Sequence, residues 1–309
     1  MRTITLFLFA ALAVTSIDAA SYQKTDGTIV DPIQTDYGTN HYYSGNNLEP
    51  YADLNSAILF SAILFSADLR YANLTEADLT LANLGAADLT DANLDGADLF
   101  DATLIGANLT SANLTSVNLE LAGLSNADLT GANLTDANLS GSTITESQFV
   151  SAASVTGVNL TGHAMSGWDL TGVDLTSANL ASATLSGATL SGADLSGAFL
   201  NNADMEVANL IQAILNGTDL TGALMWGMDL SGADLSGSIL TDTQYYNNAT
   251  WTDAFYYTDN EPAWATGMDA AWRTSVGILA LAPTSAVPEP SALLLALFGL
   301  ALLPRRRRR

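Results

Sequence analysis

The sequence predicts an all-β fold, a solenoid in which the chain bends at regular corners and stacks coil upon coil. The first observation behind this prediction is a leucine or a close substitute at every fifth position, from Leu54 to Phe149 and again from Leu160 to Tyr245. The second is the unit Ala-(Asp/Asn)-Leu-x-x, which places a small residue two positions before most of these central residues. A repeat so short and so regular is typical of solenoid proteins.

A period of five fits neither regular element. In an α-helix a step of five residues turns the side chain by about 140°, so successive leucines would spiral around the helix. In a strand an odd step sends each leucine to the opposite face. A chain that bends once per repeat instead points the leucine and the alanine inward, and its coils stack through backbone hydrogen bonds about 4.8 Å apart.

Residues twenty positions apart form columns of one type, which favours four repeats per coil. The columns are Asn73, Asn93, Asn113 and Asn133, and Thr90, Thr110 and Thr130. The chain has 20 central residues before the gap and 18 after it. We therefore expect nearly ten coils in a rod about 45 Å long. Each buried leucine contributes about 1.5–3 kcal/mol, much of which is offset by the entropy of ordering the chain.

The triplets Ala52-Asp53-Leu54, Ala72-Asn73-Leu74 and Ala193-Asp194-Leu195 resemble the pentapeptide repeat family. The resemblance covers residues 52–247. It implies a right-handed quadrilateral β-helix.

The repeat slips once, because eleven residues separate Phe149 from Leu160. If Val155 points inward, one additional residue lies within residues 150–154. We interpret this register shift as a corner bulge that the stack tolerates; a hinge or docking loop is the alternative. Just beyond it, His163 and Trp168 stand where alanine is expected, so they either swell the coil or turn outward.

Residues 1–20 have the pattern of a secretory signal peptide. Arg2 precedes an apolar run over residues 4–14, and Ala19 and Ala20 are the candidate cleavage-site residues. The run is short for a retained membrane anchor. We expect a signal helix there.

Residues 287–309 resemble a PEP-CTERM sorting tail. The motif Pro288, Glu289 and Pro290 precedes an apolar stretch over residues 292–303. Five basic residues then close the chain: Arg305, Arg306, Arg307, Arg308 and Arg309. A helix over residues 291–304 would extend about 21 Å, short of the ~30 Å hydrocarbon core.

This second resemblance implies cleavage at or near residues 288–290 by an exosortase, a membrane protease of Gram-negative-type bacteria. The arginines would hold the tail on the cytoplasmic side, so that the membrane association is transient. An ordinary tail anchor is the alternative.

The segments that flank the repeats are expected to cap them, because a stacked solenoid otherwise exposes apolar ends. Residues 21–51 form the N-terminal segment, in which residues 36–50 fold over the first coils. Residues 248–275 form an aromatic C-terminal cap, with an aromatic ligand platform as the alternative. We expect Trp226 and Tyr246 to stack, and residues 276–286 to be a linker.

Residues 51–245 carry 22 acidic side chains and a single basic one, Arg70. Such a surface repels phosphates, which excludes nucleic acid as a direct partner. Asp68, Asp88 and Asp128 fall in one column, where Ca²⁺ would relieve the repulsion between them. We favour the simpler interpretation, in which the charge keeps a long rod soluble.

The chain has no cysteine and two histidines, and no motif orders its serines and aspartates. We therefore expect no enzyme and no catalytic, cofactor or metal site. The predicted function is that of a non-enzymatic, exported structural or adhesive protein of the cell envelope, surface or matrix. The alternative is a specific interaction module for a protein, Ca²⁺ or an extracellular polysaccharide. The third is a DNA-mimic inhibitor of gyrase, because some members of the family resemble a DNA duplex in charge and width; export argues against it.

Overall fold

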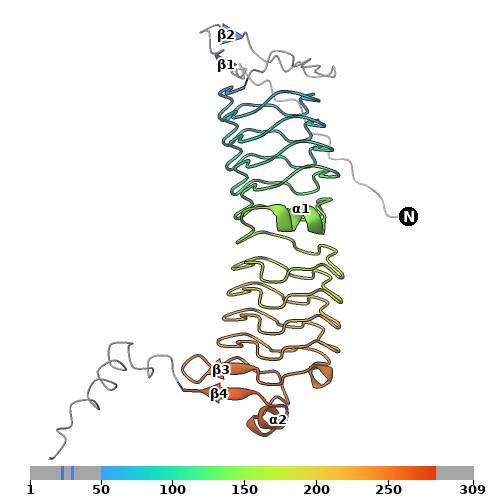
Figure 1. Ribbon diagram of the computed structural model, residues 1–309, viewed down its shortest axis with the longest axis vertical. Coiled ribbons are helices and arrows are strands. Elements are labelled where there is room, and N and C mark those ends of the chain that lie inside the picture. The colour runs from blue at the N-terminus through green and yellow to red at the C-terminus, as the bar shows by residue number, and fades with distance from the viewer. Residues whose placement is uncertain (1–21, 24–28, 31–49, 283–309) are drawn as a thin grey trace, which may run out of the picture.

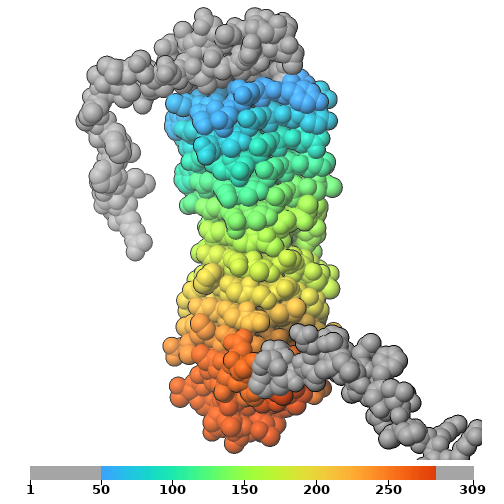
Figure 2. Space-filling view, turned by 90° about the vertical axis from the view of Figure 1, so that its left-hand side faces the viewer, coloured from blue at the N-terminus to red at the C-terminus, as the bar shows by residue number. Residues whose placement is uncertain are grey.

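The computed structural model describes residues 22–23, 29–30 and 50–282, and residues 50–282 form a straight rod of stacked coils (Figures 1 and 2). Strand β1 (Tyr22–Gln23) pairs antiparallel with β2 (Ile29–Val30). The predicted signal helix, the cap over residues 36–49 and the C-terminal hydrophobic helix lie outside the described residues. Among the described helices none is long and apolar enough to cross a membrane.

The coils have four sides, as the sequence predicts. Within each block most outward residues form a parallel bridge with the residue twenty positions later, so that four columns run along the rod. We name the sides faces A to D by their columns in the first block. Face A carries Asp53, Asn73, Asn93, Asn113 and Asn133; face B carries Ile58, Asp78, Asp98, Asn118 and Asn138; face C carries Ile63, Asn83, Thr103 and Gly123; face D carries Asp68, Asp88, Asn108 and Asp128.

The interior is a single column of leucines and alanines. None of the central residues from Leu54 to Leu240 is more than 6% exposed. The prediction is wrong at Tyr245, which is 55% exposed and has a left-handed backbone (φ 60°). The inward repeat ends there because the short 3₁₀ helix η1 (Tyr246–Asn248) leads the chain out of the coil.

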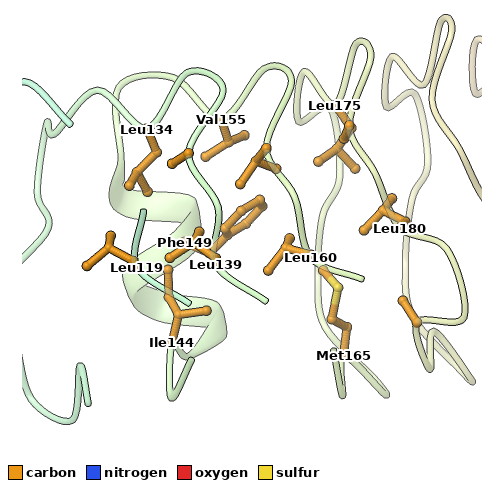
Figure 3. Packing of buried hydrophobic residues seen from close by; sticks show 14 of the residues in the cluster. Leu119, Leu134, Leu139, Ile144, Phe149, Val155, Leu160, Met165, Leu175 and Leu180 are labelled. Atoms are coloured by element: carbon orange, nitrogen blue, oxygen red, sulfur yellow. The ribbon is translucent and has the colours of Figure 1, made fainter. Parts of the chain in front are cut away.

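The register shift is accommodated by helix α1 (Glu146–Ser151), not by the predicted corner bulge. The helix begins before residues 150–154, yet it keeps Ile144 and Phe149 pointing into the core (Figure 3). The bridges Asn133↔Ser154 and Asn138↔Asn159 continue faces A and B with a spacing of 21. Within residues 50–282, faces C and D have no bridge across α1.

Gln148 repairs the ladder that α1 interrupts. Its side-chain amide donates to the carbonyl oxygens of Leu124 (2.6 Å) and Ala127 (2.9 Å), and its Oε1 accepts from the amide of Thr145 (2.9 Å). One buried side chain therefore donates to two carbonyl groups of the preceding coil and also caps α1. These hydrogen bonds avoid the cost of unpaired backbone groups.

The coil after α1 is filled by larger side chains. Val158, His163, Trp168 and Val173 occupy its four small-residue positions, and His163 and Trp168 point inward, each 9% exposed. The Trp168 ring lies 5.9 Å from that of Phe149. Of the two expected outcomes, the coil accommodates the bulk inside.

At the C-terminal end the ladder continues through longer coils. Strand β3 (Phe255–Tyr257) pairs in parallel with β4 (Leu279–Leu281), and helix α2 (Ala270–Ser275) lies between them in sequence, at the lower end of Figure 1. Two predictions are wrong here. Residues 279–281 of the expected linker form β4, and Tyr246 packs against Trp272 (5.2 Å, 90°), not Trp226, which is 49% exposed.

Candidate functional surface

The repeat 72–76 shows where each backbone amide of a coil goes. Asn73 donates to Ala52 of the preceding coil (2.9 Å), and Leu74 and Glu76 donate to the following coil (2.7 and 2.9 Å). Ala72 closes the corner by donating to Leu69 (3.1 Å). The amide of Thr75 has no backbone acceptor, and it donates to Oδ1 of Asn73 (3.3 Å).

This side-chain cap explains why the outward residue is Asp or Asn. A short side-chain oxygen two positions back is the acceptor that a turn amide finds locally. Many other turn amides donate in the same way to the Oδ1 atom two positions earlier, at 2.9–3.1 Å. They include the amides of Thr80, Thr90, Thr130, Ser196, Thr221 and Ser231. The outward carboxylates and amides thus have a structural role in the described coils.

On face A the asparagines also bind one another. The side-chain amide of Asn113 donates to Oδ1 of Asn93 (2.8 Å), and that of Asn93 donates to Oγ1 of Thr75 (2.9 Å). These bonds run along the rod and join successive coils. They form a polar ladder on a flat face.

The acidic column of face D is relieved by its own neighbours. Arg70 donates to both carboxylate oxygens of Asp68 (2.8 and 2.7 Å) and lies 3.8 Å from a carboxylate oxygen of Asp88. Asn108 separates Asp88 from Asp128. The column that suggested a Ca²⁺ site is therefore interrupted by one cation and one amide.

Hydrogen bonds stabilise several of these carboxylates in their charged form. The hydrogen bond from the Arg70 side chain lowers the pKa of Asp68, and burial, the next largest effect, opposes it. Thr130 lowers the pKa of Asp128, and Thr171 lowers that of Asp169. The surface stays negatively charged at neutral pH.

His163 is the one described histidine, and it lies inside the rod. Burial lowers its pKa, against a smaller opposite effect of the Ile144 backbone. Its ring meets Trp168 edge-on at 5.7 Å. The imidazole therefore packs against aromatic side chains inside the rod and is largely shielded from solvent.

The aromatic residues near the C-terminal end pack on one another and on the last coils. Trp251 is buried and meets Trp272 at 5.7 Å. Arg273 lies over the Trp264 ring (4.7 Å) and pairs with Glu261 (3.4 Å). This packing favours a cap over an open ligand platform.

The predicted processing residues lie outside the described residues. They are Ala19, Ala20, Pro288, Glu289, Pro290 and Arg305 to Arg309. In the described part of the chain no three His, Asp or Glu side chains converge as metal ligands.

Face C differs from the other three faces, and sequence reasoning missed it. Of its ten outward positions, only Asn83 and Asp204 cap the turn amide that follows. The ten positions are Ile63, Asn83, Thr103, Gly123, Thr143, Ala164, Thr184, Asp204, Leu224 and Gln244. Reading every twentieth residue from Ile63 to Thr143, and again from Ala164 after the register shift, would have found this column.

Comparisons with known proteins agree with the architecture. The family model described as pentapeptide repeats matches residues 62–101, 82–120, 122–162, 153–192, 188–227 and 208–242. No curated protein sequence matches the chain.

Several solved structures are similar to it. HetL, a pentapeptide repeat protein involved in heterocyst differentiation regulation in the cyanobacterium Nostoc sp. strain PCC 7120, is 31% identical over 69% of this chain and 91% of its own, with a TM-score of 0.34. QnrB1, a plasmid-mediated fluoroquinolone resistance protein, is 16% identical over 69% of this chain and 95% of its own, with a TM-score of 0.36. Rfr23 of the cyanobacterium Cyanothece 51142 is 23% identical over 52% and 90%, with a TM-score of 0.27.

Proposed function

Since the chain belongs to the pentapeptide repeat family, whose members form right-handed quadrilateral β-helices, we propose that it is a non-enzymatic structural or adhesive protein of the cell envelope. Its work is to present a long, repetitive, mostly acidic surface outside the cell. No catalytic family matches the chain, and members of this family are generally structural or interaction modules.

One observation carries this proposal. The polar groups that a reader of the sequence would test as catalytic or ligand-binding are engaged in capping and laddering the coils, as Asn73 and Asp78 are. Groups engaged in this way stabilise a scaffold. Their regular spacing along the rod suits spacing and adhesion better than a single converged site.

Export rests on the two ends of the sequence. We propose that Ala19 and Ala20 mark signal cleavage, and that residues 288–290 are recognised by an exosortase-type sorting protease. The five C-terminal arginines would retain the tail transiently at the membrane of a Gram-negative-type bacterium. A protein sorted in this way reaches the envelope, the surface or the matrix.

Mass spectrometry of the protein recovered from its host tests the sorting step. We expect the mature chain to begin near Ser21 and to end near Pro290. An intact tail through Arg309 contradicts the sorting proposal. A cytosolic pool of unprocessed protein would favour the DNA-mimic function instead.

Calorimetry distinguishes the proposed structural role from the alternative function, a specific interaction module. Titrating the protein with Ca²⁺ and with extracellular polysaccharide from the host should give no saturable heat if the rod is a spacer. Saturable binding with fixed stoichiometry favours the module.

A further inference from the structure

We propose that face C and its edge toward face D, over the first four coils, form a contact surface for a second copy of this chain. This inference goes beyond the proposed function and does not depend on export. It starts from a surface we call the neutral strip. Its residues are Ile63, Phe65, Ser66, Asn83, Gly85, Ala86, Thr103, Ile105, Gly106, Gly123, Ser125 and Asn126.

The neutral strip contains no charged residue, in a rod whose residues 51–245 carry 22 acids and one arginine. The columns on either side of it do carry acids, with Asp78 and Asp98 on face B and Asp68, Asp88 and Asp128 on face D. Asp101 and Glu120 lie at its rim, on the edge between faces B and C.

Exposed apolar side chains gather around the same face. Eight large apolar side chains are exposed between residues 51 and 145, and five of them stand on the two edges of face C. These five are Phe60, Phe65, Leu81, Ile105 and Leu121, between 44% and 62% exposed. Aromatic side chains are enriched, and charged side chains depleted, at protein contact surfaces.

At three of its four turns the strip also lacks the cap that shapes the other faces; only Asn83 provides one. Among the described residues the amides of Phe65, Ile105 and Ser125 have no acceptor, because Ile63, Thr103 and Gly123 replace Asp or Asn two positions earlier. A local hydrogen bond is lost at each of these turns. The strip is neutral because none of its four outward positions carries Asp: they hold Ile63, Asn83, Thr103 and Gly123.

The charge distribution identifies a second copy as the occupant. Two of these rods that meet through face A, B or D bring columns of carboxylates together, and like charges opposed in a contact cost several kcal/mol. The neutral strips can meet without that cost. Within the strip the Phe65 ring covers Gly85, and the exposed side chain of Ile105 stands next to Gly106, around whose missing Cβ no other atom lies within 4 Å. A two-fold contact places the same strip of each copy against the other.

A matched pair of substitutions tests the proposal. Ala86→Asp adds a charge within the strip, and Ser111→Asp adds the same charge on the edge between faces D and A. Both positions have a left-handed backbone (φ 53° and 57°), which Asp91, Asp101 and Asp136 already adopt in this block. Both variants should therefore fold, and circular dichroism checks this.

Sedimentation equilibrium of the full chain measures the association. We expect a dimer that Ala86→Asp weakens at least about tenfold, the effect of about 1.4 kcal/mol, and that Ser111→Asp leaves unchanged. Added salt should strengthen the dimer, since it screens the repulsion between the other faces. Ile105→Ser, which removes an apolar contact without adding charge, should weaken it less.

Three results would overturn the proposal. They are a monomer at every concentration at which the chain is soluble, equal weakening by Ala86→Asp and Ser111→Asp, and a dimer that neither substitution affects. The last would show that another part of the chain associates.

Discussion

The two blocks of the rod share one core but turn their corners differently. The second position of each corner is left-handed throughout. In the block before α1, 15 of the 19 corner residues between Tyr51 and Gly141 carry a side chain; in the block after it, 12 of the 18 between Gly157 and Asp242 are glycine. A left-handed backbone costs a residue other than glycine about 1–2 kcal/mol. The first block bears that strain, and the leucine column and the ladder hold the same coil in both.

What differs is the surface that the corners present. Side chains at the corners of the first block stack along the rod, as Tyr51 and Tyr71 do at 4.7 Å. Glycine corners leave the second block smoother. The core thus determines the shape of the coil, and the corner residues can vary and so determine the character of the surface.

Substitutions in the core should have the largest effect on stability, and this effect should be the same in both blocks. Leu109→Ala and Leu190→Ala each remove a fully buried side chain from a coil lined with alanines. We expect each to lower the free energy of unfolding by about 2–5 kcal/mol, measured by urea denaturation. A difference between them larger than the spread of repeated measurements would show that the two cores are not equivalent.

The junction between the blocks is the next most sensitive place. Gln148→Ala leaves the carbonyl of Ala127 without a donor, whereas the carbonyl of Leu124 still accepts from the Ala127 amide (2.9 Å). One orphaned group costs about 1–3 kcal/mol, so we expect the free energy of unfolding to fall by about that amount and the two blocks to unfold separately in calorimetry. Ser147→Ala, on the exposed side of α1, is the control. A single, unshifted transition for Gln148→Ala would contradict this role.

Substitutions at the corners, unlike those in the core, should affect stability differently in the two blocks. Gly192→Ala places a methyl group in open space, so its cost comes from the backbone alone (φ 65°), about 1–2 kcal/mol. Ser116→Ala in the first block changes no backbone preference and should stay within about 0.5 kcal/mol. Thermal denaturation of both variants measures the difference. Equal effects would mean that the corners are not strained as described.

The smallest predicted effect is a pH dependence at His163. Its folded pKa lies below the unfolded value of about 6.5, because burial disfavours the charged ring. The unfolded chain therefore takes up a proton first as the pH falls. The free energy of unfolding should be unaffected above about pH 7 and should decline as the pH falls below about 6.5. His163→Val, which repeats Val158 and Val173 of the same coil, should abolish the decline between pH 7 and pH 5. The carboxylates of Asp68, Asp128 and Asp169, whose pKa values are lowered, lose their contribution only below about pH 4.

Much of the fold could be predicted from the sequence, since a period of five admits few structures and Asn73 to Asn133 mark the coil length. The nature of the break could not. Eleven residues between Phe149 and Leu160 reveal an insertion, but only the placement of Gln148 under the carbonyls of Leu124 and Ala127 shows why a helix satisfies the ladder there. Tyr245 kept the period while the coil had already ended, because a pattern in sequence does not record where the chain leaves the core.

The candidate surface was harder to find for a related reason. The acids are conspicuous in the sequence, and the column of Asp68, Asp88 and Asp128 suggested Ca²⁺ binding as an alternative to a role in solubility. Their role in capping turns depends on amides such as that of Thr75, whose lack of a backbone acceptor appears only in the folded coil. The neutral strip becomes visible when residues twenty apart are compared column by column.

The central claim is that the outward Asp and Asn side chains cap the turn amides, and that face C lacks this cap at all but two of its turns. Amide hydrogen exchange, resolved by residue with NMR, tests it most directly. The capped amides of Thr80 and Thr130 should exchange more slowly than the uncapped amides of Ile105 and Ser125 in the same block. Equal exchange rates at the four amides would contradict the claim. They would favour the alternative in which the acidic columns bind a ligand.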